Sequence, residues 1–435
     1  MSKRSSIGSG LVVALALTIL AASCGSNGST AAGGSGDGPP VTGDLISADV
    51  ARAPGSADTA TAVAATDAMG TDLYRRLVSD AGRGNLLLSP YSIELALAMT
   101  RNGAVGDTRT QMDAVLHAGD GDQLDRSINA LDQALATRSG HRGTDARNGD
   151  VSLSVANSLW GQRGFELGQP FLTTLATDYG AGMHLVDYVA DAQGARRTIN
   201  QWVADRTNDR IPDLLPDGSV DDLTRLVLAN ALYFKAPWAM PFTDAGSPPF
   251  PRGDGTTVAA PAMTASENAT YGAGPGWKAA AIPYVGRELS MVVIVPDDLS
   301  TFEQSLDGST LASITGATTQ PLGTLQLPKF TFRSTAQLKQ PLTDAGMPLA
   351  FDAGQADFSA MSTHGDLSIG DVYHQAFIAV DEQGTEAAAA TAVTMSLSMA
   401  VSTNLVVDRP FVFVIRDDAT GATLFLGRVT DPTAT

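Results

Sequence analysis

The side chains that could act as a nucleophile, a base or a metal ligand are spread along this chain without a catalytic spacing. The sequence has no Gly-x-Ser-x-Gly turn, His-Glu-x-x-His pair, phosphate-binding loop or Cys-x-x-Cys pair, and its five histidines lack metal-ligand spacing. A solitary histidine such as His374 is more often a hydrogen-bonded core residue than a base. The sequence therefore predicts a protein that is not an enzyme and binds no metal or cofactor, and an anchored hydrolase is a weak alternative without a motif.

The one cysteine, Cys24, follows a short apolar segment near the amino terminus. Two basic residues precede the apolar residues 11–22, which are too few to span a bilayer and predict an export signal. Leu-Ala-Ala-Ser before Cys24 resembles the lipobox of bacterial lipoproteins, in which the cysteine is lipidated and becomes the new amino terminus. We expect a signal peptide over residues 1–23 and lipidation of Cys24, with an ordinary secretory signal as the alternative. The protein would be lipid-anchored on the outer face of the cell membrane or secreted.

The residues after Cys24 have the composition of a linker. Residues 25–44 are rich in Gly, Ser, Ala, Asn, Thr, Asp and Pro and contain no aromatic side chain, so they cannot bury enough surface to order themselves. Residues 45–62 remain poor in large apolar side chains. We therefore predict a flexible tether over residues 24–62 and one folded domain over residues 63–435.

A run of small side chains near the carboxyl terminus could change from a loop into a strand. After Gly384, every residue through Ala392 except Glu386 is small. In an extended strand side chains alternate between faces, so Thr385 and Ala387 would share one face while Glu386 stays in water on the other. Helix propensity alone favours an alanine-rich helix here, and on this run alone the helix is the stronger reading.

The remaining pattern predicts an α+β protein. Helical spacing covers residues 66–78, and Ser89-Pro90 opens a second helix because proline is favoured in the first turn. Apolar runs predict strands at residues 223–233 and 289–295, and a terminal hairpin from residues 411–415 and 423–426. Helices precede strands instead of alternating with them.

Charge and size restrict the class of partner. The chain has 435 residues, of which 43% are hydrophobic and 17% charged, which is enough for a large core. A formal net charge of -18 without clusters of Lys and Arg argues against a nucleic-acid ligand.

Several segments, taken in order, resemble the serpins, the family of serine protease inhibitors that act by a conformational change. The resemblance runs from about residue 63 to the end. The strongest matching segments are Asn-Ala-Leu-Tyr-Phe-Lys at 230–235 with Trp238 and Pro241-Phe242, Asp-Glu-Gln-Gly-Thr-Glu-Ala-Ala-Ala-Ala-Thr at 381–391, and Arg-Pro-Phe-Val-Phe at 409–413. The supporting segments are residues 85–92, 199–203, 327–330 and 425–429.

The resemblance implies a serpin fold with three β-sheets, about nine helices and an exposed reactive-centre loop. It also implies an irreversible, suicide-type inhibitor: a protease cuts the loop, stays attached as an acyl-enzyme, and is displaced as the hinge inserts into the main sheet. The 14 residues from Thr385 to Ser398 would carry it roughly 45 Å. A charged residue at Thr385 would oppose burial, so Thr385→Arg would turn the inhibitor into a substrate.

The family's functional positions transfer to this chain residue by residue. The hinge corresponds to Glu382, Gly384, Thr385, Glu386, Ala387, Ala388, Ala389 and Ala390. The polar cluster beneath the main sheet, where its central strands separate, corresponds to Ser89, Ser92, Asn230 and His374. The loop is about one residue longer than usual, so counts from its two ends disagree; we prefer cleavage between Met399 and Ala400, with Leu397 and Ser398 as alternatives.

The target and the mode of action follow from the loop. No Arg or Lys lies between Thr385 and Val407, which favours an elastase-, chymotrypsin- or subtilisin-like serine protease over a trypsin-like one. A cysteine protease is a further alternative. We expect a monomer whose covalent partner is the protease and which binds no nucleic acid. The alternative function is a non-inhibitory, serpin-fold binding protein on the cell surface, against which the small hinge residues argue.

Overall fold

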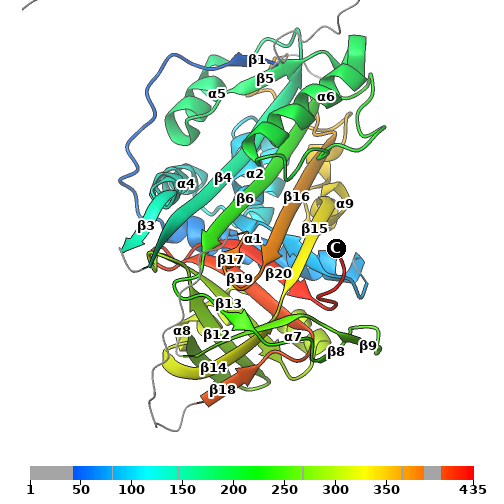
Figure 1. Cartoon of the computed structure of the whole chain (residues 1–435). Coiled ribbons are helices and arrows are strands. Elements are labelled where there is room, and N and C mark those ends of the chain that lie inside the picture. Colours follow the sequence, from blue (N-terminus) through cyan, green and yellow to red (C-terminus); the bar gives the residue numbers. More distant parts are fainter. Residues whose placement is uncertain (1–42, 81, 145–146, 267–268, 364–366, 387–402) are drawn as a thin grey trace, which may run out of the picture. The chain divides into compact units, whose positions relative to one another are not determined.

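The computed structural model describes residues 43–80, 82–144, 147–266, 269–363, 367–386 and 403–435. Within these ranges the chain forms nine α-helices, two shorter helices of other types and three sheets (Figure 1). The α-helices are α1 (Ala60–Asp80), α2 (Pro90–Arg101), α3 (Gly106–Val115), α4 (Gly121–Ala136), α5 (Gln169–Thr174), α6 (Tyr188–Arg206), α7 (Leu299–Ser305), α8 (Gly308–Ala317) and α9 (Lys339–Ala345). The π-helix η1 is Leu175–Tyr179, and the 3-10 helix η2 is Pro348–Phe351.

The eight-stranded sheet, called the main sheet below, carries the hinge. Its order is β1 (Asp44–Ile46), β5 (Met183–Val186), β4 (Arg147–Gln162), β6 (Leu226–Pro237), β17 (Gly384–Thr385), β16 (Asp371–Val380) and β15 (Phe330–Gln337), with β3 (Gly140–Thr144) paired to β4. Strands β6 and β16 also pair directly in parallel, from Val227 opposite Asp371 to Leu232 opposite Ala376. Beyond these pairs the two strands separate, and β17 lies between them (Figure 1).

The other two sheets do not contain the hinge strand β17. The ten-stranded sheet has the order β2 (Leu86–Leu88), β20 (Thr423–Val429), β19 (Phe411–Asp417), β13 (Leu289–Pro296), β12 (Trp277–Pro283), β11 (Thr270–Gly274), β14 (Gln320–Pro328), β10 (Ala262–Ser266) and β7 (Thr243–Asp244), with β18 (Thr403–Val406) paired to β14. The third sheet is β8 (Pro249–Pro251) with β9 (Thr257–Ala259). Residues 387–402, between the hinge and β18, lie outside the described residues.

The two faces of β6 enter different cores because side chains alternate along a strand. Leu228, Leu232 and Phe234 belong to the larger hydrophobic cluster, which also contains the apolar residues of α2. Val227 and Ala231 belong to a smaller cluster with the apolar residues of α6. The main sheet is thus covered on both faces near its centre, and a strand added beside β6 would meet apolar groups on each side.

The expected secondary structure agrees with most of these bounds. The predicted helix over residues 66–78 lies inside α1, and the second begins at Pro90, where the Ser89 side chain accepts a hydrogen bond from the Ser92 N–H. The terminal hairpin is β19 and β20. The expected strand at 223–233 is displaced, because β6 begins at Leu226 and continues to Pro237.

The amino-terminal segment differs from the predicted tether. Strand β1 pairs with β5, and Arg52 forms an ion pair with Asp132 at 2.7 Å. The Ala53 N–H donates to the carbonyl of Thr177 at 2.8 Å. Residues 43–59 therefore lie on the folded body. Composition missed this because backbone pairing and polar contacts, not apolar burial, hold the segment. Within the described ranges, no helix is long and apolar enough to cross a bilayer.

Candidate functional site: the hinge and the opening of the main sheet

The hinge already forms a short strand in the main sheet. Thr385 pairs with Val380 of β16 and with Ala236 of β6, in both cases antiparallel. Its side chain is 1% exposed, and its hydroxyl lies 2.7 Å from the Tyr284 hydroxyl. Sequence reasoning placed Gly384 and Thr385 where an exposed loop begins to become a strand. In this structure both residues have already entered the sheet.

Gly384 is required by close approach and not by left-handed backbone geometry. A Cβ atom at this position would collide with the carbonyl of Ala236 and the Cα atom of Pro237. The left-handed residue is instead Glu386, with φ of 51°. The left-handed residue thus follows the inserted pair, two residues later than a glycine swivel at Gly384 would place it.

Glu386 is not in water, contrary to the sequence expectation. It lies on the face opposite Thr385, but its side chain is only 11% exposed and forms an ion pair with Arg210. Burial, followed by the charge of Glu386, raises the pKa of the adjacent Tyr233. The ion pair with Arg210, which follows α6, explains how a carboxylate is accommodated at this depth.

The segment before β17 is fixed to the chain that follows β6. The N–H of Trp238 donates to the carbonyl of Gln383, and the N–H of Phe242 donates to the carbonyl of Glu382, both at 2.8 Å. The indole Nε1 of Trp238 donates to the carbonyl of Asp381 at 2.9 Å. These three bonds hold the base of the hinge, and the indole bond gives the Trp238 side chain a specific part in it.

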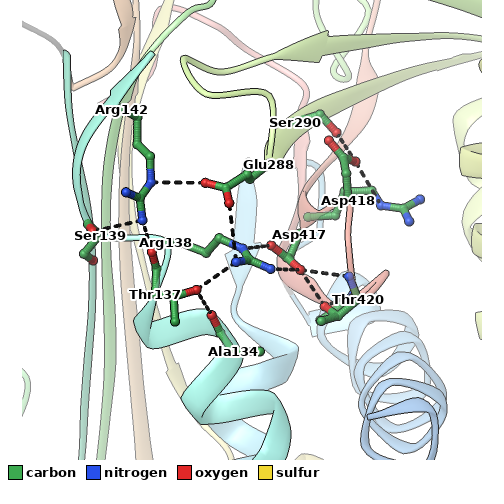
Figure 2. A network of polar contacts seen from close by, with 12 residues as sticks. Ala134, Thr137, Arg138, Ser139, Arg142, Glu288, Ser290, Asp417, Asp418 and Thr420 are labelled. Carbon is green, nitrogen blue, oxygen red and sulfur yellow. Dashed lines mark hydrogen bonds and ion pairs between the residues drawn. The ribbon is translucent and has the colours of Figure 1, made fainter. Parts of the chain in front are cut away.

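Tyr284, the partner of Thr385, is held by aromatic and polar contacts. Its ring stacks on Trp238 with centroids 4.6 Å apart, and burial raises its pKa. Figure 2 shows that Glu288, in the same turn, accepts from Arg142 at 3.1 Å and lies 3.6 Å from Arg138. Because Arg138 lies two residues after α4 and also pairs with Asp417 of β19, this network fixes the turn that presents Tyr284.

An ion pair joins the residue between β14 and β15 to the residues that precede the hinge strand. Lys329, between β14 and β15, lies 2.8 Å from Glu382 and 3.5 Å from Asp244. The hydrogen bond to Glu382 is the main reason that the pKa of Lys329 is raised. Both side chains of the Lys329–Glu382 pair are about one-quarter exposed, so solvent weakens the attraction.

The predicted polar cluster is brought together where β6 and β16 pair directly. The Ser89 N–H donates to His374 Nε2 at 3.1 Å, and His374 Nδ1 contacts Asn230 Oδ1. The Asn230 amide donates to Ser92 Oγ at 2.8 Å. It also donates to Asn157 Oδ1 at 2.7 Å, so Asn157 of β4 completes the cluster.

His374 is fully buried and neutral. Because Nε2 accepts from a backbone N–H, the ring proton is on Nδ1 and is donated to Asn230. Burial lowers the pKa of His374 to about 3. A side chain with both ring nitrogens bonded and no charge is suited to join strands and not to act as a base at neutral pH.

Several predicted site residues lie outside the described residues. They are Cys24, Ala387, Ala388, Ala389, Ala390, Leu397, Ser398, Met399 and Ala400. Sequence reasoning missed Asn157, Tyr284 and Arg210 because nothing in their local sequence distinguishes them. Among the described residues, no group of three or more His, Cys, Asp or Glu side chains could hold a metal ion.

The main sheet thus holds a two-residue hinge strand between β6 and β16, with a buried polar cluster where those two strands pair directly. Comparison with known proteins gives the family. The model of "Serpin (serine protease inhibitor)" matches residues 64–432, and the chain belongs to the serpin family. The fold with three sheets and about nine helices is thereby confirmed.

Two curated relatives and one solved structure illustrate the similarity. The chain is 33% identical over 372 residues to a leukocyte elastase inhibitor of Xenopus tropicalis, covering 83% of this chain and 97% of the relative. It is 35% identical over 369 residues to an uncharacterized serpin-like protein of Thermococcus kodakarensis, covering 83% of each. The native state of the thermophilic serpin tengpin superposes with a TM-score of 0.77 at 27% identity, covering 89% of this chain and 97% of tengpin. Membership of this family and these relatives support a protease-inhibitor role.

Proposed function

We propose that this protein is an irreversible, suicide-type inhibitor of serine endopeptidases whose cleaved loop extends β17 through the main sheet. One observation carries the proposal: the first inserted pair already has a register compatible with a full strand. Ala236 and Val380, which flank Thr385, are 144 positions apart. Val227 and Asp371, which pair directly further along, are also 144 positions apart. An inserting strand can therefore continue between β6 and β16 without a change in their register, once the direct pairs between them separate.

The side chains that would follow Thr385 suit the two faces of that strand. Residues on the Thr385 face would meet the face of β6 that carries Phe234 and Leu232, in the larger core. Residues on the Glu386 face would meet Ala231 and Val227, in the smaller core beneath α6. Alanine and threonine fit both faces without a buried charge, which supports rapid insertion.

The loop composition supports an apolar specificity. No Arg or Lys lies between Thr385 and Val407, and Met399 before Ala400 offers an apolar side chain flanked by small ones. Relatives at about one-third identity bear the name leukocyte elastase inhibitor. An elastase-, chymotrypsin- or subtilisin-like enzyme is accordingly the proposed target, with the bond from Met399 to Ala400 as its cleavage site.

The amino terminus supports a site of action outside the cytoplasm. The apolar residues 11–22 and the cysteine at position 24 match an exported lipoprotein, and β1 leaves the preceding residues as the connection to that cysteine. The protein is proposed to act as a monomer on the outer face of the membrane.

The experiment is incubation of the purified protein with an elastase-like and a subtilisin-like protease. An SDS-stable complex is expected, together with a released peptide that begins at Ala400 by mass spectrometry. Thr403→Arg is the matched control for hinge variants, because Thr403 is exposed in β18 beside the loop but outside the inserting segment. Cleavage without complex, across both enzymes and a cysteine protease, would favour a non-inhibitory binding protein instead.

A further inference from the structure

A cavity of about 870 Å³ lies at the carboxyl-terminal end of α1 and shares no lining residue with the hinge or the polar cluster. Its volume is within the range of about 300–1,000 Å³ that is typical of sites for small organic molecules. Its walls come from parts of the chain that are far apart in the sequence: the end of α1 and the turn after it, the turn between β8 and β9, the start of α7, and residues at the ends of β19 and β20 (Figure 1).

The most buried part of the lining is an ion pair. Arg428 of β20 and Glu303 of α7 lie 3.1 Å apart, and their side chains are 3% and 5% exposed. The Tyr74 hydroxyl donates to Glu303 at 2.7 Å, and Arg428 also donates to the carbonyls of Gly82 and Gly84 at 2.8 Å and 2.9 Å. Because the two charges balance and most of the Arg428 donors are occupied, this pair gives the cavity a fixed and neutral base.

The backbones of two further lining arginines, Arg83 and Arg252, are brought together by Thr430. The Thr430 hydroxyl donates to the carbonyl of Arg83 at 2.6 Å, and the Thr430 carbonyl accepts from the N–H of Gly253 at 3.1 Å. A Cβ atom at Gly253 would lie 3.2 Å from Thr430 and 3.4 Å from the Arg83 carbonyl, so the two turns are in close contact. The fold therefore places both arginines at one side of the cavity in advance of any ligand.

Both of these arginines can still donate hydrogen bonds. Arg252 forms an ion pair with Asp431 at 2.8 Å through Nε, but its two terminal nitrogens have only long contacts, of 3.5 Å and 3.4 Å, with the hydroxyls of Thr256 and Thr433. Among the described residues, the Arg83 guanidinium has no hydrogen-bond or ion-pair partner, and the side chain is exposed. A guanidinium has five N–H donors, so each of the two can bind an anionic group.

The charges beside the cavity favour a ligand with a single negative charge. Hydrogen bonds from Thr256 are the main cause of the lowered pKa of Asp254, and the charges of Arg252 and Arg83 lower it further. Asp254 and Asp298, the N-cap of α7, also line the cavity and are ionised at neutral pH, so they would repel a ligand with several negative charges. A carboxylate carries one charge and accepts two parallel bonds from a guanidinium.

The remaining lining includes an apolar wall. Val78 of α1, Leu299 of α7 and Pro410 before β19 are partly buried and face the cavity. We propose that the cavity binds an amphipathic organic carboxylate, whose head group is held by Arg83 and Arg252. The apolar body of this ligand packs against the apolar wall. The site is independent of the proposed inhibitory function, because none of its residues belongs to the hinge or the polar cluster.

The test is a ligand-observed NMR titration of the full-length protein with octanoate, a carboxylate with a straight apolar chain. Octanol has the same chain without the charge, and inorganic phosphate has charge without the chain. Arg83→Ala is the test variant, since an exposed side chain without a partner among the described residues can be removed without loss of the fold. Arg126→Ala is the matched control, because Arg126 is an exposed arginine of α4 that does not line the cavity.

The wild type and Arg126→Ala should bind octanoate at one saturable site. Arg83→Ala should bind it at least about fivefold more weakly, and octanol should bind the wild type at least about fivefold more weakly than octanoate does. Added salt should reduce the affinity of the wild type for octanoate. Absence of saturable octanoate binding, or equal binding by the wild type and Arg83→Ala, would overturn the proposal. Binding of phosphate without binding of octanoate would overturn the assignment of an amphipathic ligand. Because no protease is present, failure here leaves the inhibitory function untouched.

Discussion

The hinge end and the centre of the main sheet differ in what lies between β6 and β16. At the hinge end the two strands are already separated by β17, and Thr385 provides the backbone pairing and a hydrogen bond to Tyr284. At the centre the strands pair directly, and the His374 side chain of β16 bonds both to Asn230 of β6 and to the backbone N–H of Ser89. At the hinge end β6 and β16 are therefore already apart, whereas at the centre buried hydrogen bonds hold them together.

This difference indicates which contacts would oppose insertion of a strand between β6 and β16. A strand that enters from β17 first passes the residues of β6 and β16 that have no direct partner across the gap, and then reaches the parallel pairs from Leu232 to Val227. Separating those pairs requires the bonds of His374 and Asn230 to be exchanged for others, because a buried donor or acceptor left without a partner costs about 1–3 kcal/mol. If the proposed insertion occurs, the polar cluster is the point that controls it.

The largest effect is expected from a substitution that keeps the hinge strand β17 out of the main sheet. In Thr385→Arg a guanidinium would have to occupy a site that is 1% exposed, so β17 should leave the sheet and insertion should lose to hydrolysis. The consumption of inhibitor per protease inactivated should rise more than tenfold, and the native protein should still fold but lose the stability that the pairing and the Tyr284 bond of Thr385 provide. Thr403→Arg should leave both measurements unchanged, and an undiminished yield of SDS-stable complex from Thr385→Arg would contradict this assignment.

A second large effect is expected from removing hydrogen bonds of the polar cluster at the centre of the main sheet. His374→Leu removes the acceptor of the Ser89 N–H and the donor to Asn230, which leaves two buried groups without partners. Polymers or an inactive monomer with the loop inserted should accumulate on native gels during mild heating. The control is Gln375→Leu, on the same strand but the opposite face; if both variants behave alike, the cluster has no special role.

The free energy of unfolding should also fall in acid because of His374 in the polar cluster. An unfolded histidine has a pKa near 6.5, and burial holds the pKa of His374 at about 3. Between these values the unfolded state binds a proton that the native state does not, so stability is complete above pH 6.5 and falls as the pH is lowered toward 3, by at most about 1.4 kcal/mol per pH unit.

Urea unfolding of the wild type and His374→Gln isolates this contribution. Asp67, whose pKa is raised to about 6 chiefly by burial, titrates in both proteins and cancels in the difference. The variant should lose less stability than the wild type between pH 6.5 and pH 5. Parallel pH curves would show that His374 does not carry the acid response.

The smallest effect is expected from the exposed ion pair at the hinge end. Lys329→Ala removes the attraction to Glu382, but the pair is partly in solvent and is worth at most about 1 kcal/mol. The rate of inhibition should change less than fivefold, and the difference from wild type should shrink in high salt. A loss as large as that of Thr385→Arg would mean that the entrance, and not the polar cluster, controls insertion.

The sequence predicted features that depend on neighbouring residues better than contacts between residues far apart in the chain. The α+β class, the start of α2 at Pro90 and four members of the polar cluster follow from local patterns or from the family resemblance, whereas its fifth member, Asn157, does not. Local pattern did not predict that Thr385 is already buried, because that depends on Tyr284, about one hundred positions away, and on the separation of β6 from β16. The burial of Glu386 likewise depends on Arg210, and the pairing of β1 depends on the exposed edge of β5.

The most direct test of the account is thermal unfolding before and after the loop is cut. Cleavage at Met399 should let residues 386–395 complete the strand between β6 and β16, so the cleaved wild type should unfold at a clearly higher temperature than the intact protein. Thr385→Arg, cleaved in the same way, should show little or no rise. An unchanged or lower unfolding temperature for the cleaved wild type would contradict the claim that β17 is the beginning of an inserting strand.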